Sequence, residues 1–235
     1  SGNEGNHRDY AGMKCYPASY DGVISVGAVD ENGNGCIFSQ HNDAVDISAP
    51  GSGLSLLQSG GGYTIDSGTS FSSAYISGVA ALAVSVLDDG YDITSDQFDF
   101  LISNYSIGEK STRTGYGLIS PIDVITHANY PLVSGIEPDG IYYDNVKISF
   151  NRGEALLDSE EFKNGDLCKY TGEHILEVTE GEKTTVVHFV TDNLPLSFSL
   201  KEGDGYSYVS FPIGTATLNG HPYKSGDRIT TDGHH

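Results

Sequence analysis

The chain has 235 residues, of which 32 are acidic and 12 are basic, giving a formal net charge of −20 at pH 7. Binding to phosphates needs clustered Lys and Arg, so this composition argues against a nucleic-acid partner. No apolar run reaches the length of a membrane span, and the content of 15 Tyr, 30 Gly and no Trp is typical of a strand- and turn-rich extracellular protein.

The first 51 residues predict a loop and then two short buried strands. Residues 1–6 (Ser-Gly-Asn-Glu-Gly-Asn) have the composition of a turn. Residues 23–30 are an apolar run bounded by Gly and Asp, which predicts a buried parallel strand. After a turn at residues 30–35, residues 45–51 (Val-Asp-Ile-Ser-Ala-Pro-Gly) predict a second short strand that Pro-Gly closes.

A serine stands at the start of the most apolar stretch, residues 68–82. The segment is small and polar up to Ser70 and rich in Ala, Val, Ile and Leu after it, which predicts a helix buried in a larger domain. A serine there lies beside unpaired backbone N–H groups and the positive end of the helix dipole, where negative charge is favoured. The alternative is that Ser70 or Thr69 merely caps the helix, and Gly-Thr-Ser alone does not decide between them.

Two further helices are predicted before the character of the sequence changes. Residues 94–97 (Thr-Ser-Asp-Gln) carry a capping-box signal, and Phe98, Leu101 and Ile102 follow at helical spacing. Residues 115–124 (Gly-Tyr-Gly-Leu-Ile-Ser-Pro-Ile-Asp-Val) lead into a short closing helix.

From Pro131 onward, alternating apolar residues predict strands. The pattern of residues 149–174 recurs in residues 210–235, so this part contains a repeat. It resembles the small immunoglobulin-like β-sandwich repeats of bacterial surface and secreted proteins, which usually act as spacers or adhesive arms. The alternating residues are Val146, Ile148 and Phe150, then Ile175 or Leu176 with Val178, and Val186, His188 and Val190.

The sequence indicates no metal site and no cofactor. Cys15, Cys36 and Cys168 fit neither a disulfide framework nor a zinc pattern, so we expect buried free thiols, with a Cys15–Cys36 bridge as the alternative. Calcium cannot be placed, because the acidic residues at 43–46 and 88–89 lack a coordinating spacing. The histidines without neighbouring metal-ligand types are His174, His188, His221, His234 and His235.

Residues 68–82 resemble the nucleophile segment of the subtilisin-like serine proteases (subtilases, peptidase S8), whose pattern is Gly-Thr-Ser-x-small-small-Pro; Ala74 replaces the proline here. Five upstream segments match the family in the same order. They are residues 1–6, which resemble Ala-Gly-Asn-x-Gly, then Tyr-Pro-Ala (16–18) with Val-Gly-Ala (26–28), Phe-Ser (38–39) and Ala-Pro-Gly (49–51).

The resemblance implies a role for each matching residue. Ser70 would be the nucleophile, and Asn3 would donate its amide to the oxyanion beside the backbone N–H of Ser70. Cys15, just before Tyr-Pro, would lie at the floor of the substrate pocket. The other substrate-binding residues implied are Gly2, Glu4 and Thr69. The substrate would be a protein or peptide.

The family's histidine and aspartate, which precede the serine in its motifs, are missing. His7 and His41 lie before Ser70 without the His-Gly-Thr-His context, so neither is assigned as the base. We therefore expect this chain to be the C-terminal part of a catalytic domain, to need an upstream half as its partner, and to be catalytically silent alone.

The predicted fold is an α/β subtilase-like domain, with a partial parallel sheet and buried helices, followed by all-β immunoglobulin-like sandwich repeats. The predicted boundaries are 1–129 for the protease-like part, 130–193 for the first repeat and 194–235 for a truncated second repeat. The predicted function is a serine endopeptidase that is extracellular or on a bacterial cell surface. The alternatives are an inactive scaffold on the same fold and a surface adhesion or spacer protein.

Overall fold

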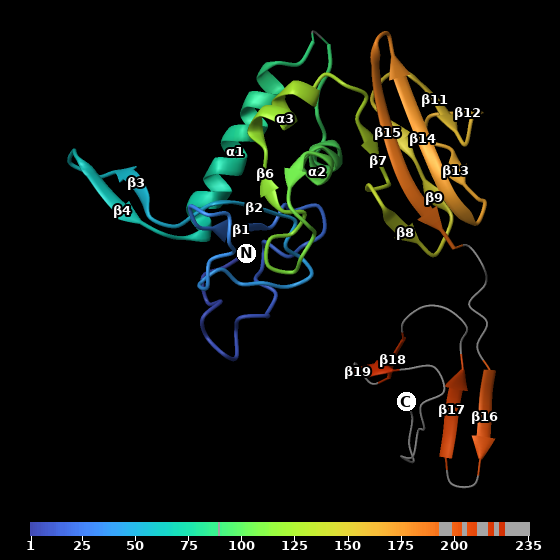
Figure 1. The fold of residues 1–235 in the computed structure, drawn as a ribbon, viewed down its shortest axis with the longest axis horizontal. Coiled ribbons are helices and arrows are strands. Elements are labelled where there is room, and N and C mark those ends of the chain that lie inside the picture. The colour runs from blue at the N-terminus through green and yellow to red at the C-terminus, as the bar shows by residue number, and fades with distance from the viewer. Residues whose placement is uncertain (89, 193–198, 204–205, 211–215, 219–220, 224–235) are drawn as a thin grey trace. The chain divides into compact units, whose positions relative to one another are not determined.

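The computed structural model describes residues 1–88, 90–192, 199–203, 206–210, 216–218 and 221–223 (Figure 1). The chain divides into two compact units, Ser1–Asp192 and Asn193–His235. No helix in the described ranges has the length and apolar character needed to cross a membrane.

The amino-terminal part of the first unit contains a four-stranded sheet. Its strands, in sheet order, are β1 (Val26–Val29), β2 (Ile47–Pro50), β6 (Leu118–Ile119) and β5 (Ser106–Ile107). β1, β2 and β6 are parallel, and β5 is an antiparallel edge strand. Because β1 is buried along its whole length and β2 is buried up to Pro50, the two predicted buried strands are confirmed, with shorter bounds.

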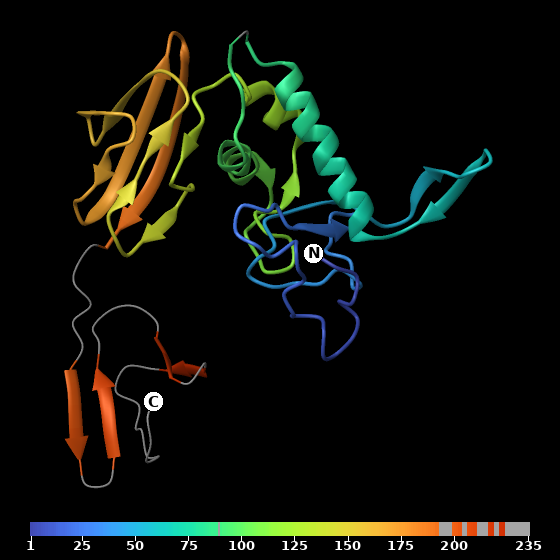
Figure 2. The same ribbon diagram turned by 180° about the vertical axis from the view of Figure 1, so that it is seen from behind.

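The helices of this part are α1 (Thr69–Ser85), α2 (Ser95–Asn104) and α3 (Pro121–His127). The capping box predicted for α2 is present, since Thr94 accepts from the Gln97 N–H while the Gln97 side chain accepts from the Thr94 N–H. A hairpin of β3 (Leu54–Leu57) and β4 (Tyr63–Asp66) projects from the sheet just before α1, as the opposite views of Figures 1 and 2 both show.

Helix α1 is buried along one stripe only. It packs on β1, β2 and α3, and its buried residues are Thr69, Ser72, Ile76, Val79 and Ala83. On the remaining surface, Tyr75 is 44%, Leu82 53% and Val84 49% exposed. The predicted apolar helix is confirmed, and the described residues bury it from one side only. Its burial in a larger domain stays a prediction.

Residues 131–192 form the strand-rich part of the same unit. The larger sheet has the order β12 (Glu160–Phe162), β11 (Glu154–Leu157), β14 (Gly172–Glu180), β15 (Lys183–Thr191) and β8 (Gly140–Tyr142). Only the β15–β8 pair in this sheet is parallel. The shorter pairs are β7 (Val133–Ser134) with β10 (Ser149–Phe150) and β9 (Val146–Lys147) with β13 (Leu167–Cys168).

The long strands β14 and β15 alternate strictly between buried and exposed residues. Leu176 and Val178 point into the core and Ile175 does not, which settles the choice left open by the sequence. On β15 the buried residues are Thr185, Val187, Phe189 and Thr191, so the alternating set Val186, His188 and Val190 belongs to the outer face. The immunoglobulin-like character of this part and the boundaries at 129 and 193 stay predictions.

In the second unit, β16 (Ser199–Gly203) pairs with β17 (Tyr206–Ser210), and β18 (Ala216–Leu218) pairs with β19 (His221–Tyr223), both antiparallel. The remaining residues of the predicted second repeat, including His234 and His235, lie outside the described residues. The assignment of residues 194–235 as a repeat therefore stays a prediction.

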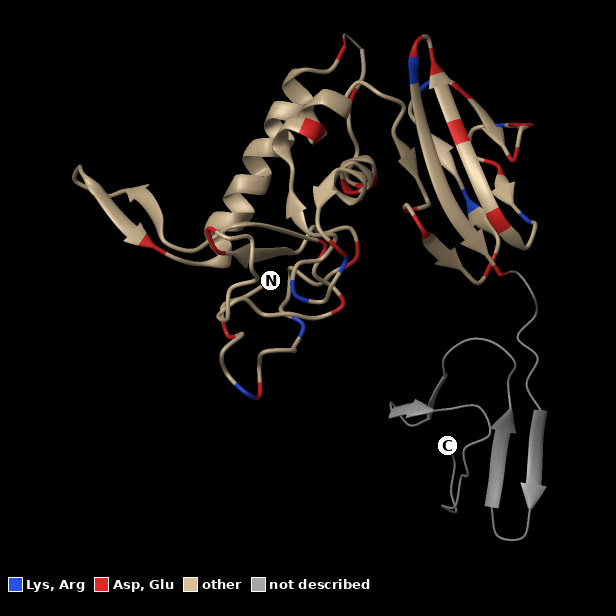
Figure 3. Cartoon of the chain, in the orientation of Figure 1, with Lys and Arg blue, Asp and Glu red and all other residues tan. Residues whose placement is uncertain are grey.

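The charges of the described residues are scattered over both parts of the first unit (Figure 3). Acidic segments outnumber the Lys and Arg segments in this view, as the net charge of −20 requires. The three cysteines are free thiols, with Cys36 and Cys168 buried and Cys15 half-buried, so the alternative Cys15–Cys36 bridge is not formed.

Candidate functional site

Ser70 lies in the first turn of α1 with its side chain exposed. The cap residue of this helix is Gly68, and no side chain of the cap closes the helix end. Within the described residues the Ser70 hydroxyl has no hydrogen-bond partner, so Ser70 does not act as the cap. Its backbone N–H is one of the first four N–H groups of the helix. These groups have no acceptor four residues earlier within the helix, and they form the positive end of the helix dipole.

Asn3 closes the same helix end from 66 residues away. Its Oδ1 accepts from the Thr69 N–H at 3.0 Å and from the Thr69 hydroxyl at 3.0 Å. Because a backbone N–H can only donate, the Asn3 atom that faces it is the carbonyl oxygen, and the orientation of the amide is fixed. The donor Nδ2 then lies toward Gly68, 3.5 Å from the place that a Cβ on that residue would take.

The loop that carries Asn3 is held against the segment of residues 38–40. The Gly5 N–H donates to the Phe38 carbonyl at 2.7 Å, and the Gln40 N–H donates to the Gly2 carbonyl at 3.0 Å. Gly2 has φ +109°, and a Cβ there would lie 1.9 Å from Gln40 Oε1 and 3.3 Å from Cys15 Sγ. Only glycine fits this position, and Cys15 lies beside it.

Of the residues that the resemblance selected, Asn3, Thr69 and Ser70 meet at the helix start, and Gly2 and Cys15 lie next to each other in the supporting loop. Glu4 is exposed in that loop, and its side chain has no hydrogen bond or ion pair among the described residues.

Sequence reasoning missed three residues that hold this site in place. Gln40 is buried and donates to the Tyr10 carbonyl at 2.9 Å. Ser72 donates to the carbonyls of Ala49 (3.1 Å) and Pro50 (3.2 Å), which fastens α1 to the end of β2. Gly51 leaves room for this contact. The Ala-Pro-Gly segment was the available signal for Gly51, whereas nothing local marks Gln40 as buried.

No histidine of the described residues hydrogen-bonds to Ser70. His7 lies against the ring of Tyr10, and the His41 backbone N–H bonds to the Ala11 carbonyl. His174 pairs with Asp158 at 2.7 Å in the strand-rich part. The described site therefore has an exposed hydroxyl with N–H donors beside it, and no histidine among the described residues is placed to take the hydroxyl proton.

The described residues contain no group of three or more His, Cys, Asp or Glu placed to hold a metal ion. A calcium site, which the sequence could not place, stays unplaced. Two half-buried carboxylates lie in the same part of the chain. Asp46 accepts from the Ser25 N–H at 2.6 Å, and the buried Oδ1 of Asp99 has no hydrogen-bond partner in the described residues.

Burial, with the negative charges of Asp46 and Glu137 adding to it, raises the pKa of Asp99 from 3.8 to about 7. The folded state then binds more protons than the unfolded state between about pH 4 and 7, so this carboxyl lowers stability as the pH rises through 7. We expect Asp99→Asn to raise the free energy of unfolding by about 1–3 kcal/mol at pH 8 and to leave it nearly unchanged at pH 4.

Urea denaturation of residues 1–235 across this pH range, with a chelator present, checks the Asp99 prediction. Asp9→Asn, at an exposed carboxylate of the amino-terminal loop, is the matched control and should change stability by less than about 0.5 kcal/mol at either pH. An Asp99→Asn variant with the same pH dependence as the parent chain would show that Asp99 ionises normally.

Comparison with known proteins gives a consistent picture. The model of the subtilase family (peptidase S8) matches residues 1–120. Alkaline elastase YaB of Bacillus sp. (strain YaB) is 43% identical over 82 residues, which are 35% of this chain and 20% of the elastase. The intracellular serine protease of Paenibacillus polymyxa is 31% identical over 123 residues, covering 51% of this chain and 38% of that protease.

Among solved structures, the prenylagaramide maturation protease PagA superposes with a TM-score of 0.47 and 29% identity, over 55% of this chain and 48% of PagA. The chain thus spans 20% of the length of the elastase and 38% of that of the intracellular protease.

Proposed function

This chain belongs to the subtilase family, and we propose that it carries the nucleophile and the oxyanion-binding groups of a serine endopeptidase. The observation that supports this most is the bond from the Thr69 N–H to Asn3 Oδ1, which brings a second amide donor to the helix start that presents Ser70. Two unpaired N–H donors beside an exposed hydroxyl are the arrangement that acyl transfer requires.

In the proposed reaction, Ser70 Oγ attacks the carbonyl carbon of a peptide bond as its proton passes to a base. The carbonyl π electrons move to the oxygen, and the Ser70 N–H and Asn3 Nδ2 donate to the resulting oxyanion. When the C–N bond breaks, the amine leaves with the proton returned by the base, and water then hydrolyses the acyl-enzyme. We place the base and its orienting aspartate on polypeptide outside residues 1–235.

Protein or peptide is the proposed substrate, with Gly2, Glu4 and Thr69 lining its path and Cys15 at the pocket floor. An extracellular or cell-surface location is proposed from the composition, which is rich in Tyr and Gly and poor in Lys and Arg. The second candidate is an inactive scaffold on the same fold, which the lack of a histidine bonded to Ser70 among the described residues favours.

Labelling with a fluorophosphonate, which captures activated serines, separates the two candidates. We expect no labelling of residues 1–235 and labelling of a longer polypeptide that continues upstream of Ser1. Ser70→Ala should abolish it, whereas Ser73→Ala, at an exposed serine of the same helix, should not. A folded longer polypeptide that does not label would overturn the enzyme proposal and leave the scaffold.

A further inference from the structure

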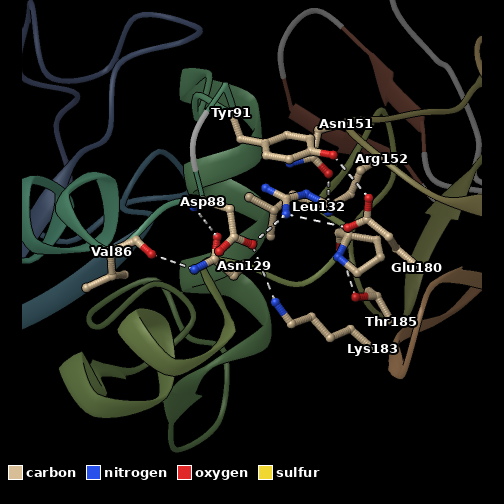
Figure 4. Close-up of polar contacts among 11 residues, drawn as sticks. Val86, Asp88, Tyr91, Asn129, Leu132, Asn151, Arg152, Glu180, Lys183 and Thr185 are labelled. Carbon is tan, nitrogen blue, oxygen red and sulfur yellow. Dashed lines mark hydrogen bonds and ion pairs between the residues drawn. The ribbon is translucent and has the colours of Figure 1, made fainter.

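We propose that residues 131–192 brace the helix that carries Ser70, and that Arg152 couples the two parts. A spacer would be joined to its neighbour by a mobile linker with few contacts across it. The contacts around Arg152 have the opposite character (Figure 4).

Arg152 lies between β10 and β11, and its side chain is only 2% exposed. Its Nη1 is 3.4 Å from Asp88 Oδ2 and 3.5 Å from Glu180 Oε2. Asp88 follows the end of α1, whereas Glu180 ends β14. One buried cation therefore contacts a carboxylate from each part, and a buried charge depends strongly on such partners.

Tyr91, in the loop after α1, covers the guanidinium. Its ring centre is 3.4 Å from Arg152 Cζ, and its hydroxyl donates to Glu180 Oε1 at 3.1 Å. Nε and Nη2 of Arg152 are buried and have no hydrogen-bond partner among the described residues, so the aromatic face is a main part of their surroundings. Lys183 of β15 adds a contact of 3.6 Å to Asp88.

The short segment that connects the two parts is hydrogen-bonded to both of them. Asn129 donates from Nδ2 to the Val86 carbonyl at 2.5 Å and accepts at Oδ1 from the Asp88 N–H at 2.8 Å, which fastens it to the end of α1. The Pro131 carbonyl accepts from the Thr185 hydroxyl at 2.7 Å, which fastens it to β15. The connection between the two parts is therefore held on each side.

Apolar packing supports the same contact. Helix α2 packs against β7, and the buried residues of both parts form one continuous core. Phe98 and Leu101 of α2 and Leu132 and Val133 beside or in β7 all belong to this core. Because both polar and apolar contacts join the parts, we expect them to move as one body.

The contact with Arg152 lies at one end of α1 and Ser70 lies at the other, so a change in this contact can move Ser70. This step rests on the proposed function. A helix of 17 residues is about 25 Å long, so a tilt of about 3° at its Arg152 end moves Ser70 by roughly 1 Å. A displacement of that size can cost a large factor in a reaction that depends on alignment. Arg152 is thus proposed as a positioning residue that acts through α1.

Amide hydrogen exchange on the full chain tests the brace without requiring activity. We expect Arg152→Met to increase exchange at residues 83–87, where α1 ends, about tenfold or more, while the amides of β14 stay protected. Arg8→Met, at an exposed arginine of the amino-terminal loop, is the control and should change neither.

Unchanged exchange at residues 83–87 in a folded Arg152→Met variant would overturn the coupling. If that variant does not fold, Tyr91→Leu decides, because Tyr91 is 39% exposed and its loss removes the stacking and one hydrogen bond only. We expect Tyr91→Leu to increase amide exchange at residues 83–87 about threefold. No increase in this variant would likewise overturn the coupling.

Fluorophosphonate labelling of the longer polypeptide tests the positioning step separately. Slower labelling of Arg152→Met is the expected result, and an unchanged rate despite faster exchange would remove the positioning role while keeping the brace. Absence of labelling in the parent polypeptide would count against the proposed function and not against the brace.

Discussion

Asn3→Asp should lower the kcat of the longer polypeptide toward a peptide substrate by about 10²–10³, the magnitude known for an oxyanion-hole asparagine of this same family. The aspartate keeps an oxygen for the N–H and hydroxyl of Thr69, which now donate to Asn3 Oδ1. It replaces the Nδ2 donor with an anionic oxygen that repels the developing oxyanion. The free energy of unfolding should hardly change, because a carboxylate at a helix N-terminus is favourable.

Two further variants separate the two roles of Asn3, which are donation to the oxyanion and capping of helix α1. Thr69→Val removes the hydroxyl donor to Oδ1 and keeps the backbone N–H, so we expect kcat to fall only severalfold. Asn6→Asp adds the same charge at an exposed position of the same loop and should have little effect. A kcat for Asn3→Asp close to that of the parent would mean that Asn3 only caps the helix.

The elements that the sequence predicted well are those with local signals. The buried strands around Val26 and Ile47 are short apolar runs with turn residues at their ends, and these features lie within ten residues. The start of α2 follows from Thr94 and Gln97, whose side chains and backbone bond to each other three positions apart. Such contacts need no knowledge of the tertiary structure.

The features that the sequence did not predict depend on distant contacts or on register. Arg152 stands in an Asn-Arg-Gly turn, which is typical of an exposed loop, and it is buried only because Tyr91 and Glu180 cover it. Strand β15 carries valines on both faces, so a shift of one residue exchanges the buried and exposed sets. In the same way, local periodicity gave α1 no preferred face, and its buried stripe is set by β1, β2 and α3.

The second large effect expected is on stability, from Gly51→Ala. A Cβ on Gly51 would lie 2.3 Å from Ser72 Oγ and 2.7 Å from the Ala28 Cβ. Ser72 is fully buried and bonded to the carbonyls of Ala49 and Pro50, so it cannot move aside without losing these bonds. The added methyl must push α1 away from β1 and β2, and we expect a loss of about 2–4 kcal/mol in the free energy of unfolding.

Gly78→Ala is the matched control in the same helix, and urea denaturation of residues 1–235 compares the two. A Cβ on Gly78 meets nothing within 4 Å, so alanine should stabilise the helix by about 0.5–1 kcal/mol. A Gly51→Ala variant as stable as Gly78→Ala would contradict the tight contact between α1 and β2. Ser72→Ala added to Gly51→Ala should recover part of the loss, because it removes the nearest of the atoms that the new methyl meets.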